Sequence, residues 1–234
     1  TSFIDVVTNM GGLKLFLPLI QHVDYPIAFE KTNDSSHFLL SILCLFKQFF
    51  QNSETIQRDF FQFQGPKSLA YLLSLIDKET ISSRILNQLC EIFCSLREKK
   101  YRLIFIHDIF LNFSLWRCYK SETYITLLEY TWERIYSQEI SLLIESFSIS
   151  NILFLLNNEK DRNVRQGLWS FLQKYAQEVF PVDDQETLFE FAFSDVSTEL
   201  RLEILDNMYF MMRSKLFNFH KMFEKNDYYD PFVH

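Results

Sequence analysis

The sequence predicts an all-α protein, an irregular α-solenoid of the armadillo or HEAT type with about ten or eleven helices. Turn-forming residues are scarce, with 4 glycines and 5 prolines in 234 residues, whereas an all-β fold needs a turn roughly every 8–12 residues. Hydrophobic residues make up 48% of the chain and aromatic residues 17%, which is enough to build a large core. The apolar residues recur with helical spacing in short segments, a pattern typical of stacked helices rather than of a bundle of a few long ones.

Each element follows from its apolar spacing and its boundary residues. Gly11 and Gly12 end the first helix, and Pro18 disturbs the second. Pro66 lies in a first helical turn, where its missing N–H costs little. Asp183 and Glu186 have the spacing of a capping box. The segments predicted in this way as helical are 2–10 (the end of a helix), 13–23, 36–51, 53–64, 66–76, 80–95, 121–137, 140–147, 150–157, 161–179, 183–193 and 197–224, the last of them bent or split near residue 212. Residues 103–111 form an apolar segment and residues 112–120 a Trp-containing connection.

One stretch has the pattern of an armadillo unit. A short helix over 54–63 is followed by Gly65, by Leu69-x-x-Leu72-Leu73 on a second helix, and by a third helix over 81–93. We expect Gly65 to permit the sharp turn between the first two helices. Partial repeats of the second helix occur at 15–20 and 150–156 with unequal spacing, so the array is expected to be irregular.

Charge argues against a nucleic-acid partner. The net charge is −7 and the isoelectric point is about 5.3, whereas nucleic-acid-binding domains carry a basic face. The densest basic cluster comprises Arg97, Lys99, Lys100 and Arg102. We interpret it as a solvated loop or helix end, with a phosphate or lipid-headgroup contact as the alternative.

The sequence also lacks the signals of a metal, cofactor or catalytic site. The four cysteines Cys44, Cys90, Cys94 and Cys118 lie among apolar residues without CxxC or HxxxH spacing, so we interpret them as buried, reduced structural thiols of a cytosolic protein. His107 and Asp108 are adjacent, and neighbours on an α-helix are not expected to face each other. We therefore predict no catalytic, cofactor-binding or metal-binding residue, no cofactor and no enzymatic activity.

Peptide binding is the natural activity of a solenoid, because its concave face offers a groove. Nuclear-import adaptors of this class carry Trp with Asn three residues later, whereas here Tyr136 follows Trp132 and Gln173 follows Trp169, each at +4. An import adaptor is therefore disfavoured. Tyr228, Tyr229 and Phe232 are expected to cover the end of the array, with an interaction patch as the alternative.

Membrane insertion is not indicated. The most apolar stretch, residues 38–50, is interrupted by polar residues and is shorter than the ~18–20 residues of a membrane span. The last predicted helix carries mixed charges, which is typical of a solvated face and not of a membrane-surface helix. The chain opens with Thr1 inside an apolar-periodic segment, and we expect it to be part of a larger protein.

Several segments together resemble the armadillo-like region of BEACH-family, neurobeachin-type proteins. They are 11–20 (GGLKLFLPLI), 57–76 (QRDFFQFQGPKSLAYLLSLI), 86–96 (LNQLCEIFCSL) and 110–135 (FLNFSLWRCYKSETYITLLEYTWERI), within a resemblance that is clearest over 8–157. Residues 160–234 are expected to add further helices to a single armadillo-like domain over 1–234.

The resemblance implies a non-catalytic scaffold segment of a large protein that also carries PH-like, BEACH and WD-repeat domains and acts in vesicle and membrane trafficking. Its expected partners are other proteins or other domains of the same chain, and its expected location is cytoplasmic and peripheral to endomembranes through those other domains. The alternative is an unrelated HEAT or armadillo adaptor or a GTPase-binding regulatory module.

Overall fold

The computed structural model describes residues 3–23, 34–117, 119–136, 147–214 and 216. These residues form helices and no strand, so the all-α prediction is confirmed. The chain divides into two compact units, Thr1–Phe147 and Ser148–His234, here called unit 1 and unit 2 and described separately. Within the described ranges, no helix is both long enough and apolar enough to cross a membrane. That 1–234 forms one armadillo-like domain stays a prediction.

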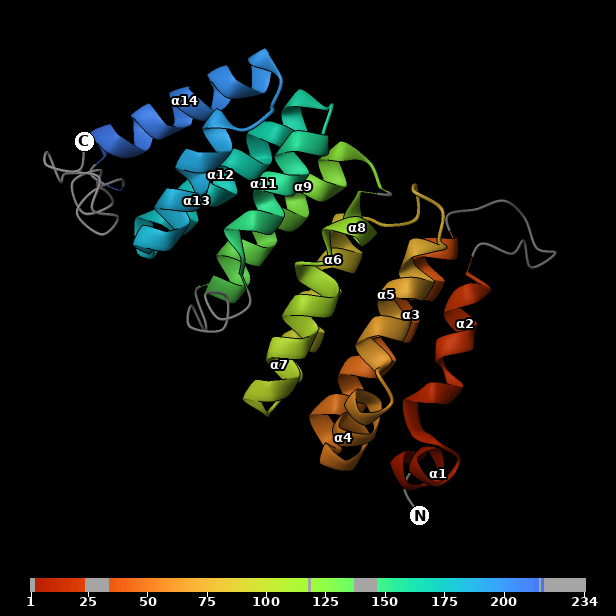
Figure 1. The fold of residues 1–234 in the computed structure, drawn as a ribbon. Helices are drawn as coiled ribbons and strands as arrows, with labels where there is room; N and C mark the ends of the chain where they lie inside the picture. The colour runs from red at the N-terminus through yellow and green to blue at the C-terminus, as the bar shows by residue number, and fades with distance from the viewer. Residues whose placement is uncertain (1–2, 24–33, 118, 137–146, 215, 217–234) are drawn as a thin grey trace, which may run out of the picture. The chain divides into compact units, whose positions relative to one another are not determined.

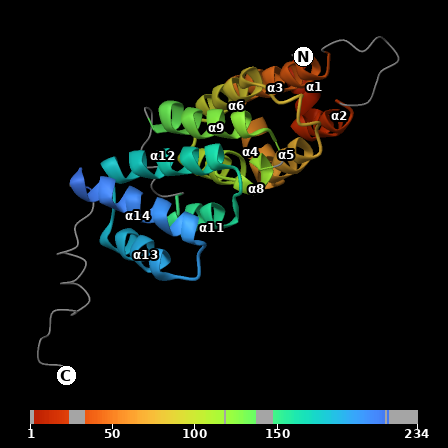
Figure 2. The ribbon, with the colours of Figure 1, turned by 90° about the horizontal axis from the view of Figure 1, so that it is seen from above.

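Unit 1 is built from short helices that alternate between two layers. Helices α3, α6 and α9 contact one another in sequence and form one layer, while α2, α5 and α8 form the second (Figure 2). Their bounds are α1 Phe3–Asn9, the 3-10 helix η1 Gly12–Leu15, α2 Leu17–Gln21, α3 Asp34–Asn52, α4 Glu54–Gln62, α5 Gly65–Ser74, α6 Ser83–Ser95, α7 Lys99–Phe105, the π-helix η2 Ile106–Phe110, α8 Phe113–Trp116, α9 Ser121–Tyr130 and the π-helix η3 Thr131–Tyr136.

The layers group the helices into armadillo-like triplets. Helices α4, α5 and α6 form the unit that was predicted over 54–93, and α2 occupies the same layer as α5, as the partial repeat at 15–20 indicates. A further triplet, α7, α8 and α9, was not predicted, because residues 112–120 were interpreted as a connection. Helix α8 has only four residues, little more than one turn, so it shows no apolar periodicity.

One predicted helix of unit 1 is divided in the structure. The helix expected over 13–23 is divided at Phe16 into η1 and α2, and Pro18 lies in the first turn of α2. Gly11 and Gly12 do end α1, with φ of 115° and 69°, which are conformations that favour glycine. Ser53 caps α4 by accepting a hydrogen bond from the Ile56 amide at 3.2 Å.

Aromatic side chains fill the interior of unit 1 where α3 meets α4. The rings of Phe50 and Phe60 are 5.2 Å apart at 63°, and those of Phe46 and Phe60 are 5.8 Å apart at 75°. Phe61 stacks on Tyr101 of α7 at 4.4 Å and 16°. Edge-to-face and offset pairs of this kind stabilise by about 0.5–1.5 kcal/mol beyond the area they bury, and they give the abundant phenylalanines a structural role.

Gly65 is required for a different reason from the one predicted. The residue with positive φ at the α4–α5 turn is Gln64, at 56°. Gly65 begins α5 against Phe60, and a Cβ atom at Gly65 would lie 2.5 Å from the Phe60 ring and 2.6 Å from the Phe60 carbonyl oxygen. The glycine therefore permits a close approach of α5 to α4 and does not relieve the turn.

Unit 2 consists of helix pairs. Helices α11 and α13 contact each other in one layer, and α12 and α14 contact each other in the second. Figure 1 labels the four helices, and Figure 2 shows the two layers. Asp161 caps α12 and Ser197 caps α14, accepting hydrogen bonds from the Asn163 and Leu200 amides at 2.8 and 3.2 Å. The helix bounds are α11 Ile149–Asn158, α12 Arg162–Glu178, α13 Val182–Phe193 and α14 Thr198–Arg213.

One prediction about unit 2 was wrong. The capping box of Asp183 and Glu186 does not form: α13 follows Pro181 without a side-chain cap, so Asp183 lies within the first turn, where the helix dipole favours an acid. Asp184 accepts a hydrogen bond from the Tyr175 hydroxyl at 2.8 Å, and burial raises the pKa of Asp184 above its usual value. Helix α14 ends at Arg213, next to residue 212, where the last predicted helix was expected to bend or split. Residues 217–224 of the predicted last helix lie outside the described residues, as do 137–146.

Substitutions at two adjacent residues of the α4–α5 turn should change the free energy of unfolding in opposite directions. Gly65→Ala should lower the free energy of unfolding by about 1–3 kcal/mol, because the new methyl group meets Phe60. Gln64→Gly should raise it by up to about 1 kcal/mol, because glycine adopts the left-handed conformation without strain. Chemical denaturation of the two variants measures both changes. Equal effects of the same sign would contradict this account of the turn.

Candidate functional site

The described part of unit 1 carries a groove between α4–α5 and α7–η2, here called groove 1. Its volume is about 600 Å³, which lies within the range of ligand sites. The lining residues are Phe61, Gln64, Lys67, Leu103, Ile104, His107 and Asp108.

The floor of groove 1 is apolar. Phe61 is held by its stacking on Tyr101, Leu103 is half-buried, and Ile104 is 39% exposed. Gln64, Lys67 and His107 supply the polar groups at the edge, so the groove combines an apolar centre with a polar rim, as protein interfaces do.

A His–Asp pair lies in groove 1 on the π-helix η2. His107 Nδ1 is 2.9 Å from Asp108 Oδ1, and the His107 side chain is 74% exposed while that of Asp108 is 8% exposed. The expectation that these neighbours do not face each other was wrong. A π-helix has more residues per turn than an α-helix, so adjacent side chains are separated by a smaller angle.

This pair can orient an imidazole toward a partner. With the proton on Nδ1, His107 donates to the buried Asp108 carboxylate and leaves Nε2 free to accept a hydrogen bond. The described residues that line groove 1 include no serine, threonine or cysteine that such an imidazole could activate. The arrangement therefore suits recognition of a polar group better than nucleophilic chemistry.

A second groove, here called groove 2, lies in unit 2 between α12 and α14 and has a volume of about 440 Å³. Gln173 of α12 donates from Nε2 to Asn207 Oδ1 of α14 at 2.7 Å. The sequence has no Asn three residues after Trp169, but the fold brings Asn207 of α14 to the same groove. The lining residues are Arg162, Gln166, Trp169, Ser170, Gln173, Glu203 and Asn207.

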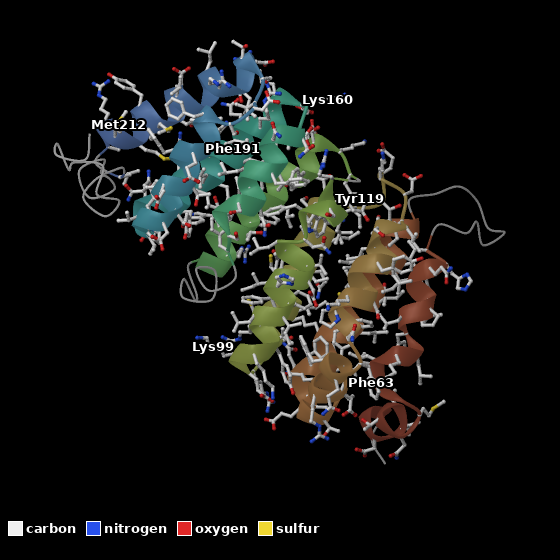
Figure 3. The ribbon with its side chains drawn as sticks, in the orientation of Figure 1. Phe63, Lys99, Tyr119, Lys160, Phe191 and Met212 are labelled. Atoms are coloured by element: carbon white, nitrogen blue, oxygen red, sulfur yellow. The ribbon has the colours of Figure 1, made fainter. Side chains whose placement is uncertain are left out.

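The arginines of the basic cluster at 97–102 form hydrogen bonds with carbonyl groups at helix ends. Arg97 pairs with Glu54 and donates to the Gln51 carbonyl oxygen at 3.0 Å, and Arg102 donates to the Leu96 carbonyl oxygen at 2.7 Å. Lys100 pairs with Glu98 at 2.8 Å. These contacts agree with the helix-end interpretation. Figure 3 shows Lys99 and Phe63 toward one end of unit 1 and Tyr119 toward the other.

The prediction that all four cysteines are buried is wrong for two of them. Cys90 is buried, but Cys44 and Cys94 are exposed, and Cys118 lies outside the described residues. Cys90 and Cys94 are four residues apart, yet only Cys90 faces the core. Burial, with a smaller contribution from Cys94, raises the pKa of Cys90 to about 12. In the parts of the chain that are described, no group of three or more His, Cys, Asp and Glu side chains could hold a metal ion.

Comparison with known proteins gives one family. A family model described as "Neurobeachin/BDCP, DUF4704 alpha solenoid region" matches residues 1–156. Neither the curated proteins nor the solved structures provide a match. The matched residues include all of groove 1 and none of the residues that line groove 2.

The cysteines should differ in the rate at which they react with a thiol reagent. In the folded chain at pH 8, a maleimide should label Cys44 and Cys94 much faster than Cys90, because the Cys90 thiol is buried and stays protonated. Peptide mass spectrometry after timed labelling reads each site, and unfolding in denaturant should make the rates similar. Rapid labelling of Cys90 in the folded chain would contradict its burial.

Proposed function

Since the chain belongs to the family of the Neurobeachin/BDCP DUF4704 alpha solenoid region, we propose that it is a non-catalytic protein-interaction segment of a large BEACH-type protein. The proposal includes a scaffold role in vesicle and membrane trafficking, at a cytoplasmic location peripheral to endomembranes. The family match supports this proposal over the alternative of an unrelated HEAT or armadillo adaptor. No described feature specifically favours a GTPase-binding module.

Groove 1 is the single observation that carries the interaction role. It lies within the matched region and joins an exposed apolar side chain, Ile104, to a polar rim with an oriented imidazole, His107. Apolar centres surrounded by polar groups are where protein partners gain most of their binding energy. The proposed occupants are other proteins or other domains of the same large chain.

A charge placed in groove 1 should weaken partner binding. Ile104→Glu puts a carboxylate where a partner would bury an apolar contact, and an unpaired buried charge is costly. Leu45→Glu is a matched control, because Leu45 and Ile104 are both 39% exposed and Leu45 is not among the residues that line groove 1.

The measurement is quantitative capture of partners from cell extract by the 1–234 chain and the two variants. We expect Ile104→Glu to lower retention of the specific partners by at least about ten-fold, equivalent to about 1.4 kcal/mol, while Leu45→Glu retains them. Equal retention by the three chains, or no specific retention by any, would argue against groove 1 as the interaction site. Circular dichroism verifies that both variants are folded.

A further inference from the structure

Helix α13 of unit 2 presents the acidic and apolar groups that groove 1 of unit 1 is suited to bind. We propose that α13 of a second copy of this chain docks in groove 1, with Phe193 on the apolar floor and Glu190 paired to Lys67. This occupant rests on the interaction role proposed above for groove 1. It follows from the charges of the two surfaces and from the side chains that each of them exposes.

The helices that border groove 1 carry more basic than acidic side chains. Segments 53–76 and 97–110, which contain α4, α5, α7 and η2, hold six lysines and arginines against four aspartates and glutamates, whereas the whole chain has a net charge of −7. Each of the four carboxylates lies beside a basic side chain or His107. Asp108, which lines the groove, is 8% exposed and contacts His107, whereas Lys67 is exposed and has no ion pair with the described residues. A partner at groove 1 therefore meets positive charge.

The net charge of unit 2 is concentrated on α13. The described residues of unit 2 hold eleven acidic and six basic side chains, a net charge of −5, and α13 alone accounts for four of the acidic and none of the basic ones. The helices that pack most extensively against α13 do not neutralise it, because α11 carries no charged residue and α14 carries three acidic and two basic residues. A partner of α13 should therefore be basic.

The outward face of α13 combines acidic side chains with aromatic rings. Leu188 is buried on the opposite side of the helix. On the outward side, Glu186, Glu190 and Phe193 follow one another at i, i+4 and i+7. Phe193 is 70% exposed, and its ring lies 4.9 Å from that of Phe189. Figure 2 shows α13 at the edge of unit 2. Large apolar side chains that gather on a surface mark interaction sites, so this acidic, aromatic face is suited to contact another surface.

Groove 1 and the outward face of α13 are complementary in apolar surface as well as in charge. An amphipathic helix in an apolar groove is a recurrent mode of recognition, and Phe193 supplies an aromatic anchor for the floor at Ile104. Glu190 is exposed and has no ion pair within the described part of the chain. Lys67 lies in the first turn of α5, where the helix dipole also favours a carboxylate. Opposite charges of this kind orient two partners more than they add affinity.

The two surfaces differ from each other, so the contact between two copies is heterologous. A copy that offers α13 to its neighbour keeps its own groove 1 open for another copy. Such head-to-tail contacts produce rings or open filaments. Self-association through groove 1 should therefore continue beyond a dimer as the concentration of the chain rises.

Sedimentation velocity of the 1–234 chain measures its self-association up to about 200 µM, a concentration that populates a complex of micromolar affinity. We expect association that weakens with added salt. Phe193→Ser and Ile104→Glu should each weaken it by at least about ten-fold, because each removes one side of the apolar contact. Tyr209→Ser is the matched control, because Tyr209 of α14 is 62% exposed and belongs to neither surface. Circular dichroism verifies that the variants are folded.

Exchange of the two charges tests the orientation of the contact. Lys67→Glu and Glu190→Lys should each weaken self-association by about three-fold or more, because each places like charges together. An equimolar mixture of the two variants should associate more strongly than either alone, since it offers opposite charges again. Lys78→Glu, an exposed lysine outside both surfaces, makes the same change in net charge and should associate normally.

Three results would each overturn the proposal: a monomer at every concentration, association that Phe193→Ser leaves unchanged, or no gain in the mixture of charge variants. The role of groove 1 itself is tested separately by the capture of partners from cell extract. If Ile104→Glu loses those partners while the unmodified chain stays monomeric, groove 1 keeps its proposed interaction role and the second copy is excluded as its occupant.

Discussion

The buried carboxamide of Gln57 is the contact on which the arrangement of unit 1 depends. Gln57 is 1% exposed, and its Nε2 donates to the Phe50 carbonyl oxygen at 2.7 Å and to the Ser95 carbonyl oxygen at 3.1 Å. Its Oε1 accepts from the Arg97 amide at 3.3 Å. One side chain of α4 therefore satisfies groups at the ends of α3 and α6, where helices leave carbonyl groups without partners.

The consequences extend to groove 1. Because Gln57 ties α4 to the ends of α3 and α6, it fixes where α7 begins, and the stacking of Phe61 on Tyr101 then sets α4 against α7. In unit 2, Arg165 has a comparable role, since it joins α12 to Glu199 and Glu203 of α14. The Glu203 hydrogen bonds raise the pKa of Arg165 above its ordinary value.

Helical periodicity was sufficient to predict the fold class and most helices, because buried apolar side chains recur at the helical period. It could not reveal α8, which is too short to show a period, or the role of Gly65, which depends on a contact with Phe60. Gln57 was also missed, although it lies three and four residues before Phe60 and Phe61, on the same face. The two grooves depend on contacts between helices and on the π-helix at His107, which spacing does not encode.

Hydrogen exchange in the Gln57→Met variant tests the central claim most directly. Methionine has a similar volume but cannot make the three hydrogen bonds of Gln57. We expect much faster exchange in α4 and at the ends of α3 and α6, with α12 and α14 unchanged. Exchange in α4 equal to that of the unmodified chain would contradict the role assigned to Gln57.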